Sequence, residues 1–140
     1  MTGTVSDTYV AALQHNFAEI PADATLVGVV RRPTRWFYGA IDENEPALGP
    51  PRKLLTAVNE CEARHIENGL AEAAAHNRAM ADCDFDRRYR EYLVTDTEAR
   101  AGLQRLRERL EDGEDIAVVC FENTEEKRCH RTIVRSFLQE

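Results

Sequence analysis

The sequence predicts one α/β domain with a small, mainly parallel sheet flanked by helices. Two short apolar runs rich in β-branched residues, at residues 25–30 and 115–121, are typical of strands that are covered on both faces. Segments with apolar residues at helical spacing separate these runs. Because strands that alternate with helices form parallel sheets through right-handed crossovers, this order favours an α/β fold. A length of 140 residues is that of a single domain, so we expect residues 1–140 to form one unit.

The N-terminal part predicts a strand, a helix and a second strand. Residues 2–5 are the candidate first strand, and Ser6 is a suitable N-cap because its hydroxyl can accept from free backbone N–H groups. Large apolar residues then follow at helical spacing, which predicts an amphipathic helix over residues 7–18. The apolar run at residues 25–30 is the next strand, and Pro33 ends it.

The segment from residue 31 to residue 51 looks irregular because it contains four of the five prolines. A loop of this length is long for a compact domain, so we expect a short element inside it, and a fourth strand is one candidate. Apolar spacing then predicts three helices, at residues 54–66, 70–80 and 84–93.

The last third of the chain predicts a helix, a strand and a closing helix. Thr95 and Glu98 match a capping box with Thr95 as N-cap, and Gly113 suits the left-handed residue after the helix end. Residues 115–121 form the clearest buried strand of the chain. Residues 129–139 form the closing helix, with its apolar side chains turned inward.

The charge balance is acidic and almost free of lysine. Asp and Glu total 25 against 18 Lys and Arg, which gives a net charge of −7, and Lys53 and Lys127 are the only lysines. Exposed lysine stems add apolar surface, whereas carboxylates hold water strongly, so we expect a halophilic, haloarchaeal type of protein. The same balance argues against bulk nucleic-acid binding, which needs a basic face.

The sequence predicts a cytoplasmic protein. It has no apolar stretch near the roughly 20 residues that span a bilayer, and no basic and apolar leader. In a reducing cytoplasm, cysteines serve as thiols, ligands or nucleophiles rather than as a disulfide framework. The four cysteines are Cys61, Cys83, Cys120 and Cys129.

Cys120 stands at the carboxyl end of the buried strand, where open α/β sheets bind ligands. After a short polar loop, Cys129, His130 and Arg131 begin the closing helix. The N-terminus of a helix attracts anions, and a cysteine beside it and beside arginines has more of the nucleophilic thiolate. This juxtaposition predicts an anion-binding site with a reactive cysteine.

The residues around this loop resemble a known family. Residues 118–122 (VVCFE) and 129–133 (CHRTI) look like the C-x-E…C-H-R signature of the domain of unknown function 488 (DUF488) family, and residues 27–33 (VGVVRRP) resemble its strand that ends in an arginine-bearing loop. The resemblance implies a rhodanese-like three-layer sandwich, a site at Cys120 and Arg131, and no established activity. Two positions depart from the expected patterns. The family's aspartate before the first arginine is replaced by valine, and Glu126 stands where the C-x5-R loop of rhodaneses and tyrosine phosphatases has its arginine, which disfavours a phosphatase.

The residues do not decide whether the protein is an enzyme. If it is a thiol enzyme, analogy of fold favours sulfur transfer through a persulfide of Cys120. Cys120 would be the nucleophile and Arg131 would hold an anionic small molecule. Glu122 would orient Arg131, and His130 would be either a general acid or base or a donor to a neighbouring loop. Cys129 could resolve an oxidised Cys120. The remaining expected ligand-binding residues, at the end of the preceding strand, are Arg31 and Arg32.

Other interpretations remain open. Cys120 could be a small hydrophobic residue of the core, and Arg31 and Arg32 a solvated charge cluster. A non-catalytic module could use the same crevice for a phosphate-bearing ligand or a nucleic-acid end. Zinc ligation around Cys120 is disfavoured by the spacing, so we expect neither metal nor cofactor. We interpret Cys61 and Cys83 as packing residues and the other histidines as surface or hydrogen-bonded helix residues.

Overall fold

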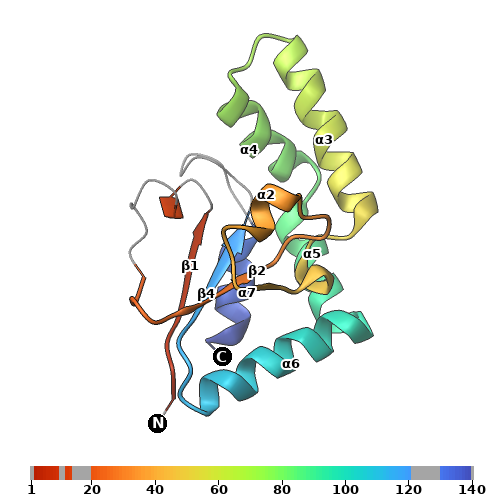
Figure 1. Cartoon of the computed structure of the whole chain (residues 1–140). Helices are drawn as coiled ribbons and strands as arrows, with labels where there is room; N and C mark the ends of the chain where they lie inside the picture. The colour runs from red at the N-terminus through yellow and green to blue at the C-terminus, as the bar shows by residue number, and fades with distance from the viewer. Residues whose placement is uncertain (1, 10–11, 14–19, 121–129, 140) are drawn as a thin grey trace.

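The computed structural model describes residues 2–9, 12–13, 20–120 and 130–139, and within them it has a four-stranded parallel sheet and six α-helices (Figure 1). The sheet order is β1-β4-β2-β3, and all pairings are parallel. The carboxyl ends of all four strands therefore lie at one edge. The strands are β1 (Val5–Tyr9), β2 (Thr25–Gly28), β3 (Glu43–Asn44) and β4 (Ile116–Cys120).

Strand β4 is one of the two inner strands of the sheet, and β2 is the other. It pairs with β1 on one side, where Tyr9 lies opposite Cys120, and with β2 on the other, where Gly28 lies opposite Val119. All five of its residues are buried, as expected of an apolar strand that is covered on both faces. The predicted strand at residues 115–121 is thus confirmed at its centre.

The predicted helix over residues 7–18 is wrong at its beginning. Residues 7–9 belong to β1, and Ser6 lies within that strand rather than at a helix cap. The reason is that β1 is an edge strand whose backbone pairs with β4, more than 100 residues away, and this pairing outweighs the local apolar spacing. Residues 10–11 and 14–19 lie outside the described part of the chain.

The segment at residues 31–51 contains the expected extra strand. It folds into a short helix, α2 (Arg35–Tyr38), then β3, and then a 3₁₀ helix, η1 (Pro46–Leu48). Phe37 is fully buried against the sheet, whereas half of Trp36 and Tyr38 is exposed. Only one of the three consecutive aromatic residues therefore fills the core.

The longer helices agree with their predictions, but the cap of α6 differs. Asp96, not Thr95, is the N-cap, and its carboxylate accepts from the Ala99 N–H at 3.0 Å. The Thr95 hydroxyl instead donates to the Glu91 carbonyl within the preceding helix. Gly113 has a φ of 99°, as predicted for the residue after the helix. The helices are α3 (Arg52–Glu67), α4 (Glu72–Asp82), α5 (Phe85–Thr95), α6 (Thr97–Glu111) and α7 (Arg131–Leu138).

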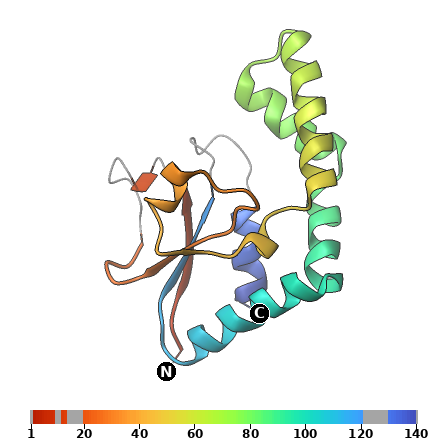
Figure 2. The same cartoon turned by 45° about the vertical axis from the view of Figure 1, so that its right-hand side comes forward.

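Most of the core lies on the face of the sheet that carries α7. This helix packs on β1 and β4, and α6 packs on α7 and η1. A smaller cluster around Phe37 and Val119 covers the opposite face. Helices α3 and α4 form a hairpin that stands away from the sheet (Figure 2). None of the helices in the described part of the chain is long and apolar enough to cross a lipid bilayer.

Candidate functional site

The candidate site lies at the carboxyl ends of β1 and β4, where α7 begins. Register places Tyr9 beside Cys120, and Asp7 two residues earlier on the same edge strand. Arg131 is the first residue of α7, and this helix packs across both strands. The position agrees with the general rule that open parallel sheets carry their ligand sites beyond the carboxyl ends of the strands.

Arg131 joins the two strands through its guanidinium group. Its Nη1 donates to the Cys120 Sγ at 2.8 Å, and its Nε donates to the Asp7 Oδ1 at 3.1 Å. The side chain is buried, with 10% of its surface exposed. Because the guanidinium is planar with donors in a fixed fork, the bond to Asp7 also determines how Nη1 meets the sulfur.

Asp7 anchors this arrangement. Its second oxygen, Oδ2, accepts from the Arg135 Nη1 at 2.8 Å, so one carboxylate holds two arginines that lie one turn apart on α7. The ring of Tyr9 lies 5.3 Å from the Arg131 guanidinium carbon, within the range of a cation–π contact. Arg131 is thereby fixed by a carboxylate and an aromatic ring while it contacts the sulfur.

Cys120 is buried and is part of a disulfide, whereas Cys61 and Cys83 are free thiols. The expectation of unpaired thiols therefore does not hold for Cys120. Its side chain sits at the end of the most buried strand, next to a guanidinium. A disulfide at such a position differs from the framework disulfides of small secreted proteins, which connect loops where the core is small.

His130 precedes α7 and serves as an anchor. Its Nε2–H donates to the backbone carbonyl of Val29, the residue after β2, and its ring meets the Tyr89 ring edge-on with 5.5 Å between the ring centroids. Burial lowers the pKa of His130 to about 4, and the positive charge of Arg131 acts in the same direction. The imidazole is therefore neutral near pH 7 and carries out the second of its two expected roles, donation to a neighbouring segment.

Arg31 follows β2, and its guanidinium binds the proline-rich segment and α5. Its Nε donates to the Pro50 carbonyl at 2.7 Å, and its Nη2 donates to the Gly49 carbonyl at 3.0 Å and to the Tyr92 hydroxyl at 2.6 Å. Its guanidinium also lies against the Tyr92 ring. These contacts tie the proline-rich segment to α5. Arg32 is exposed.

Two expected site residues, Glu122 and Cys129, lie outside the described residues. Asp7 holds Arg131 in the role that the sequence suggested for Glu122, and sequence reasoning missed it. The signal was hidden because residue 7 was placed in a helix. If residue 7 had been predicted near the end of a strand, Asp7 would have been expected at the same edge of the sheet as Cys120.

A second set of chemistry-bearing side chains lies in the α3–α4 hairpin. Cys61, His65 and Asp82 bring their ligand atoms within 4.8 Å of one another. The sequence carries a signal for two of them, because Cys61 and His65 are four residues apart and so share one helix face.

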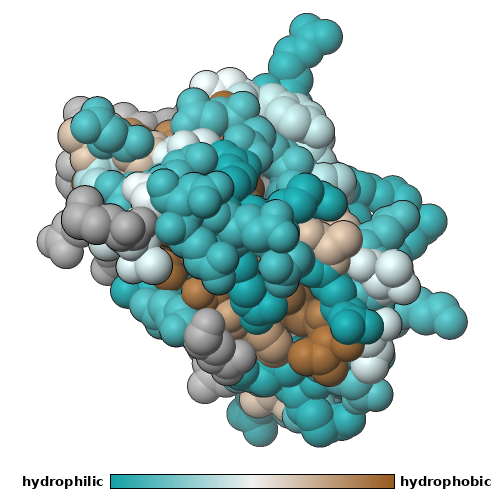
Figure 3. Space-filling model, turned by 90° about the horizontal axis from the view of Figure 1, so that it is seen from below, coloured by the Kyte–Doolittle hydropathy of each residue, from teal (hydrophilic) through white to brown (hydrophobic). Residues whose placement is uncertain are grey.

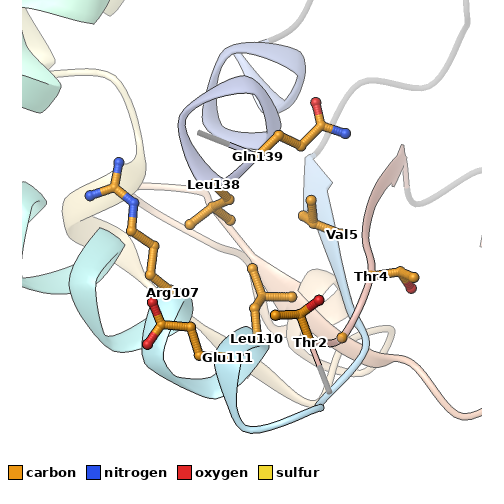
Figure 4. Close-up of a pocket in the computed structure, with 9 residues that line it drawn as sticks. Thr2, Thr4, Val5, Arg107, Leu110, Glu111, Leu138 and Gln139 are labelled. Atoms are coloured by element: carbon orange, nitrogen blue, oxygen red, sulfur yellow. The ribbon is translucent and has the colours of Figure 1, made fainter.

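The opposite, amino-terminal edge of the sheet is hollowed. A pocket there is lined by residues of β1, α6 and α7, among them Val5, Leu110 and Leu138 (Figure 4). Seen from below, this side shows apolar side chains between hydrophilic ones (Figure 3). The pocket lies at the other end of the strands from Cys120, so it is separate from the candidate site.

Comparison with known proteins identifies the family of the chain. No curated protein and no solved structure matches it. The family model described as "Active DUF488-N3 subclade" matches residues 9–140, a range that includes Cys120, Arg131 and Tyr9 and begins two residues after Asp7. With nearly all of its length matched, the chain belongs to this branch, DUF488-N3a, of the DUF488 family.

Proposed function

We propose that the protein is a thiol-dependent enzyme that transfers sulfur from an anionic small molecule, with Cys120 as the nucleophile. The observation that carries the proposal is the contact between the Arg131 Nη1 and the Cys120 Sγ at 2.8 Å. Once the disulfide of Cys120 is reduced, a guanidinium at this position favours the thiolate over the thiol, and the thiolate is the nucleophilic form. The word "active" in the family description also supports an enzyme, and it names no reaction.

In the first step, the Cys120 thiolate attacks the outer sulfur of a donor such as thiosulfate. The S–S bond of thiosulfate breaks, sulfite leaves with its electron pair, and Cys120 becomes a persulfide anion. The negative charge moves from the Cys120 Sγ to the outer sulfur of the persulfide, one bond away. Arg131 can therefore stabilise both forms without moving, provided that Asp7 holds its guanidinium in place.

In the second step, a second thiol of the chain attacks the inner sulfur of the persulfide. It gives up its proton, hydrosulfide leaves, and a disulfide forms. We assign the attacking thiol to Cys129, and the disulfide at Cys120 supports a cycle of this kind. A dithiol reductant would then reduce the disulfide and return both cysteines to thiols.

The wider setting is part of the same proposal. A rhodanese-like fold is supported by the parallel sheet with a cysteine at the carboxyl end of an inner strand. A salt-rich cytoplasm, of the haloarchaeal kind, is supported by the net charge of −7 and the scarcity of lysine.

The test is sulfite release from thiosulfate by the reduced protein, in concentrated KCl with a dithiol as acceptor. Cys120→Ser should abolish turnover. Arg131→Lys should lower the rate of turnover about tenfold or more. A lysine has one ammonium group and lacks the planar guanidinium that binds Asp7 and the sulfur at the same time. Arg100→Lys, an exposed position on α6, is the matched control and should behave as wild type.

Cysteine alkylation resolved by peptide mass spectrometry provides a second measurement. After reduction, Cys120 should react faster than Cys61 and Cys83 in the same sample, and Arg131→Lys should remove the difference. If Cys120 reacts only when the protein unfolds, the enzyme proposal is wrong. A phosphate-bearing ligand that raises the melting temperature of wild type and Cys120→Ser equally would then favour the binding module.

A further inference from the structure

The α3–α4 hairpin contains a compact group of metal-ligand types. The Asp82 Oδ2, at the end of α4, lies 2.7 Å from the His65 Nε2 and 3.6 Å from the Cys61 Sγ, both on α3. All three ligand atoms lie within 4.8 Å of one another. They come from two helices that pack together, so the packing of the hairpin itself holds them in place.

A fourth donor adjoins this group. Cys83 follows Asp82 directly and lies near Cys61, although its sulfur is not among the three ligand atoms that lie within 4.8 Å of one another. Both cysteines are free thiols. The next residue, Asp84, has a φ of 51°, so the chain turns sharply into α5 just beyond the two donors. Asp82 and Cys83 are thus held at the junction of three helices.

The donor set and the distances fit zinc. Thiolate sulfur, imidazole nitrogen and carboxylate oxygen are its usual ligands, and structural sites are tetrahedral with four of them. With bond lengths of roughly 2.0–2.3 Å, the sulfur–oxygen edge of such a tetrahedron is about 3.6 Å and the nitrogen–oxygen edge about 3.4 Å. The first agrees with the distance between Cys61 and Asp82. The second requires His65 and Asp82 to separate by less than about 1 Å.

Burial also suits a structural site. Cys61 is 6% exposed, whereas the side chains of His65 and Asp82 are 20% and 49% exposed. A metal ion could therefore enter from the side of the carboxylate and be covered by the helices on the side of Cys61.

We propose that Cys61, His65, Asp82 and Cys83 bind one Zn²⁺ ion that joins α3, α4 and the start of α5. On binding, the two thiol protons pass to solvent and His65 takes the tautomer with its hydrogen on Nδ1, so that Nε2 faces the metal. No redox step is involved. The hairpin stands away from the sheet, and a metal ion at the end of α4 would join its two helices in addition to their apolar packing (Figure 2).

The test is a titration of the reduced, chelator-treated full chain with Co²⁺, followed by competition with Zn²⁺. We expect one equivalent of cobalt, the visible bands of a tetrahedral ion, and a near-ultraviolet charge-transfer band from two thiolates. Cys61→Ser and His65→Ala should weaken binding by at least about 100-fold, the upper range seen when only outer-shell partners of a metal site are lost. Cys83→Ser should halve the charge-transfer band.

Cys120→Ser is the matched control and should bind cobalt as wild type does. Loss of binding in this variant, or unchanged binding in Cys61→Ser and His65→Ala, would overturn the proposal. Retention of much less than one equivalent of zinc by the wild-type chain would also overturn it. As a folding readout that does not depend on spectra, zinc should slow hydrogen exchange at the end of α4 in wild type and not in His65→Ala.

Discussion

At the scale of single residues, the site depends on one carboxylate that holds two arginines. Asp7 is mostly buried, with 14% of its side chain exposed, and it pairs with Arg131 and Arg135 through different oxygen atoms. Buried charges are costly without partners, so the loss of this carboxylate would leave two cations poorly compensated. Asp7 therefore contributes both to stability and to the position of the group next to Cys120.

Asp7→Asn tests this role. We expect the free energy of unfolding to fall by about 2–4 kcal/mol, because the variant leaves two buried or half-buried guanidinium groups without a charged partner. Urea denaturation in concentrated KCl measures the change. Asp23→Asn, at an exposed position, is the control and should stay within about 0.5 kcal/mol of wild type. An equal loss in both variants would contradict the special role of Asp7.

His130 predicts a pH dependence of stability. Its pKa of about 4 in the folded chain lies below the ordinary value of 6.5, so between these values the unfolded chain binds the extra proton. The stability that follows from the neutral imidazole is therefore complete above pH 6.5 and is lost as the pH falls toward 4. Over this pH range, the loss in the free energy of unfolding is up to about 3 kcal/mol.

The measurement is urea denaturation of wild type and His130→Gln at several pH values from 4 to 7.5. The variant should be less stable than wild type at pH 7.5, because it loses the bond to the Val29 carbonyl, but it should depend less on pH. If both proteins lose stability in parallel as the pH falls, His130 is not the group responsible.

At the scale of helices and strands, the sequence predicted most where the signal is local. The apolar spacing in α3 to α6 is a property of neighbouring turns, so these helices were found nearly at their observed ends. Strand β1 was misread because an edge strand is defined by its pairing with β4, which no local pattern records. The sequence placed Cys120 at the end of a strand and Arg131 at the start of a helix, so their proximity could be predicted. The place of Asp7 could not, because it depends on the register of β1 with β4.

The cap of α6 allows a direct test of the difference between sequence pattern and structure. Asp96→Ala should destabilise the protein by about 1 kcal/mol, since its carboxylate accepts from the Ala99 N–H and lies at the positive end of the helix. Thr95→Ala, at the position that the capping-box pattern selects, is the matched control. Its hydroxyl donates within α5, so we expect a smaller loss. Equal losses in thermal or urea unfolding would favour the sequence pattern over the observed cap.

At the scale of the whole molecule, the net charge of −7 is the dominant long-range feature. Mutual repulsion among the carboxylates destabilises the compact state, and salt screens it, since the Debye length falls from about 10 Å at 0.1 M to about 3 Å at 1 M. The same screening weakens exposed ion pairs such as Arg87 with Asp84, which contribute little. The buried contacts of Asp7 with Arg131 are screened much less.

The stability of the chain should therefore rise with KCl concentration. We expect the urea concentration at the midpoint of unfolding to increase when KCl is raised from 0.05 M to 1 M and above. A fold that is stabilised by exposed ion pairs would show the opposite change. A triple variant, Glu60→Gln, Glu67→Gln and Glu111→Gln, replaces three exposed carboxylates and changes the formal charge from −7 to −4. Its stability should depend less steeply on salt than that of wild type. If the two slopes are equal, salt acts through preferential exclusion and apolar burial rather than through charge, and the acidic surface serves solubility alone.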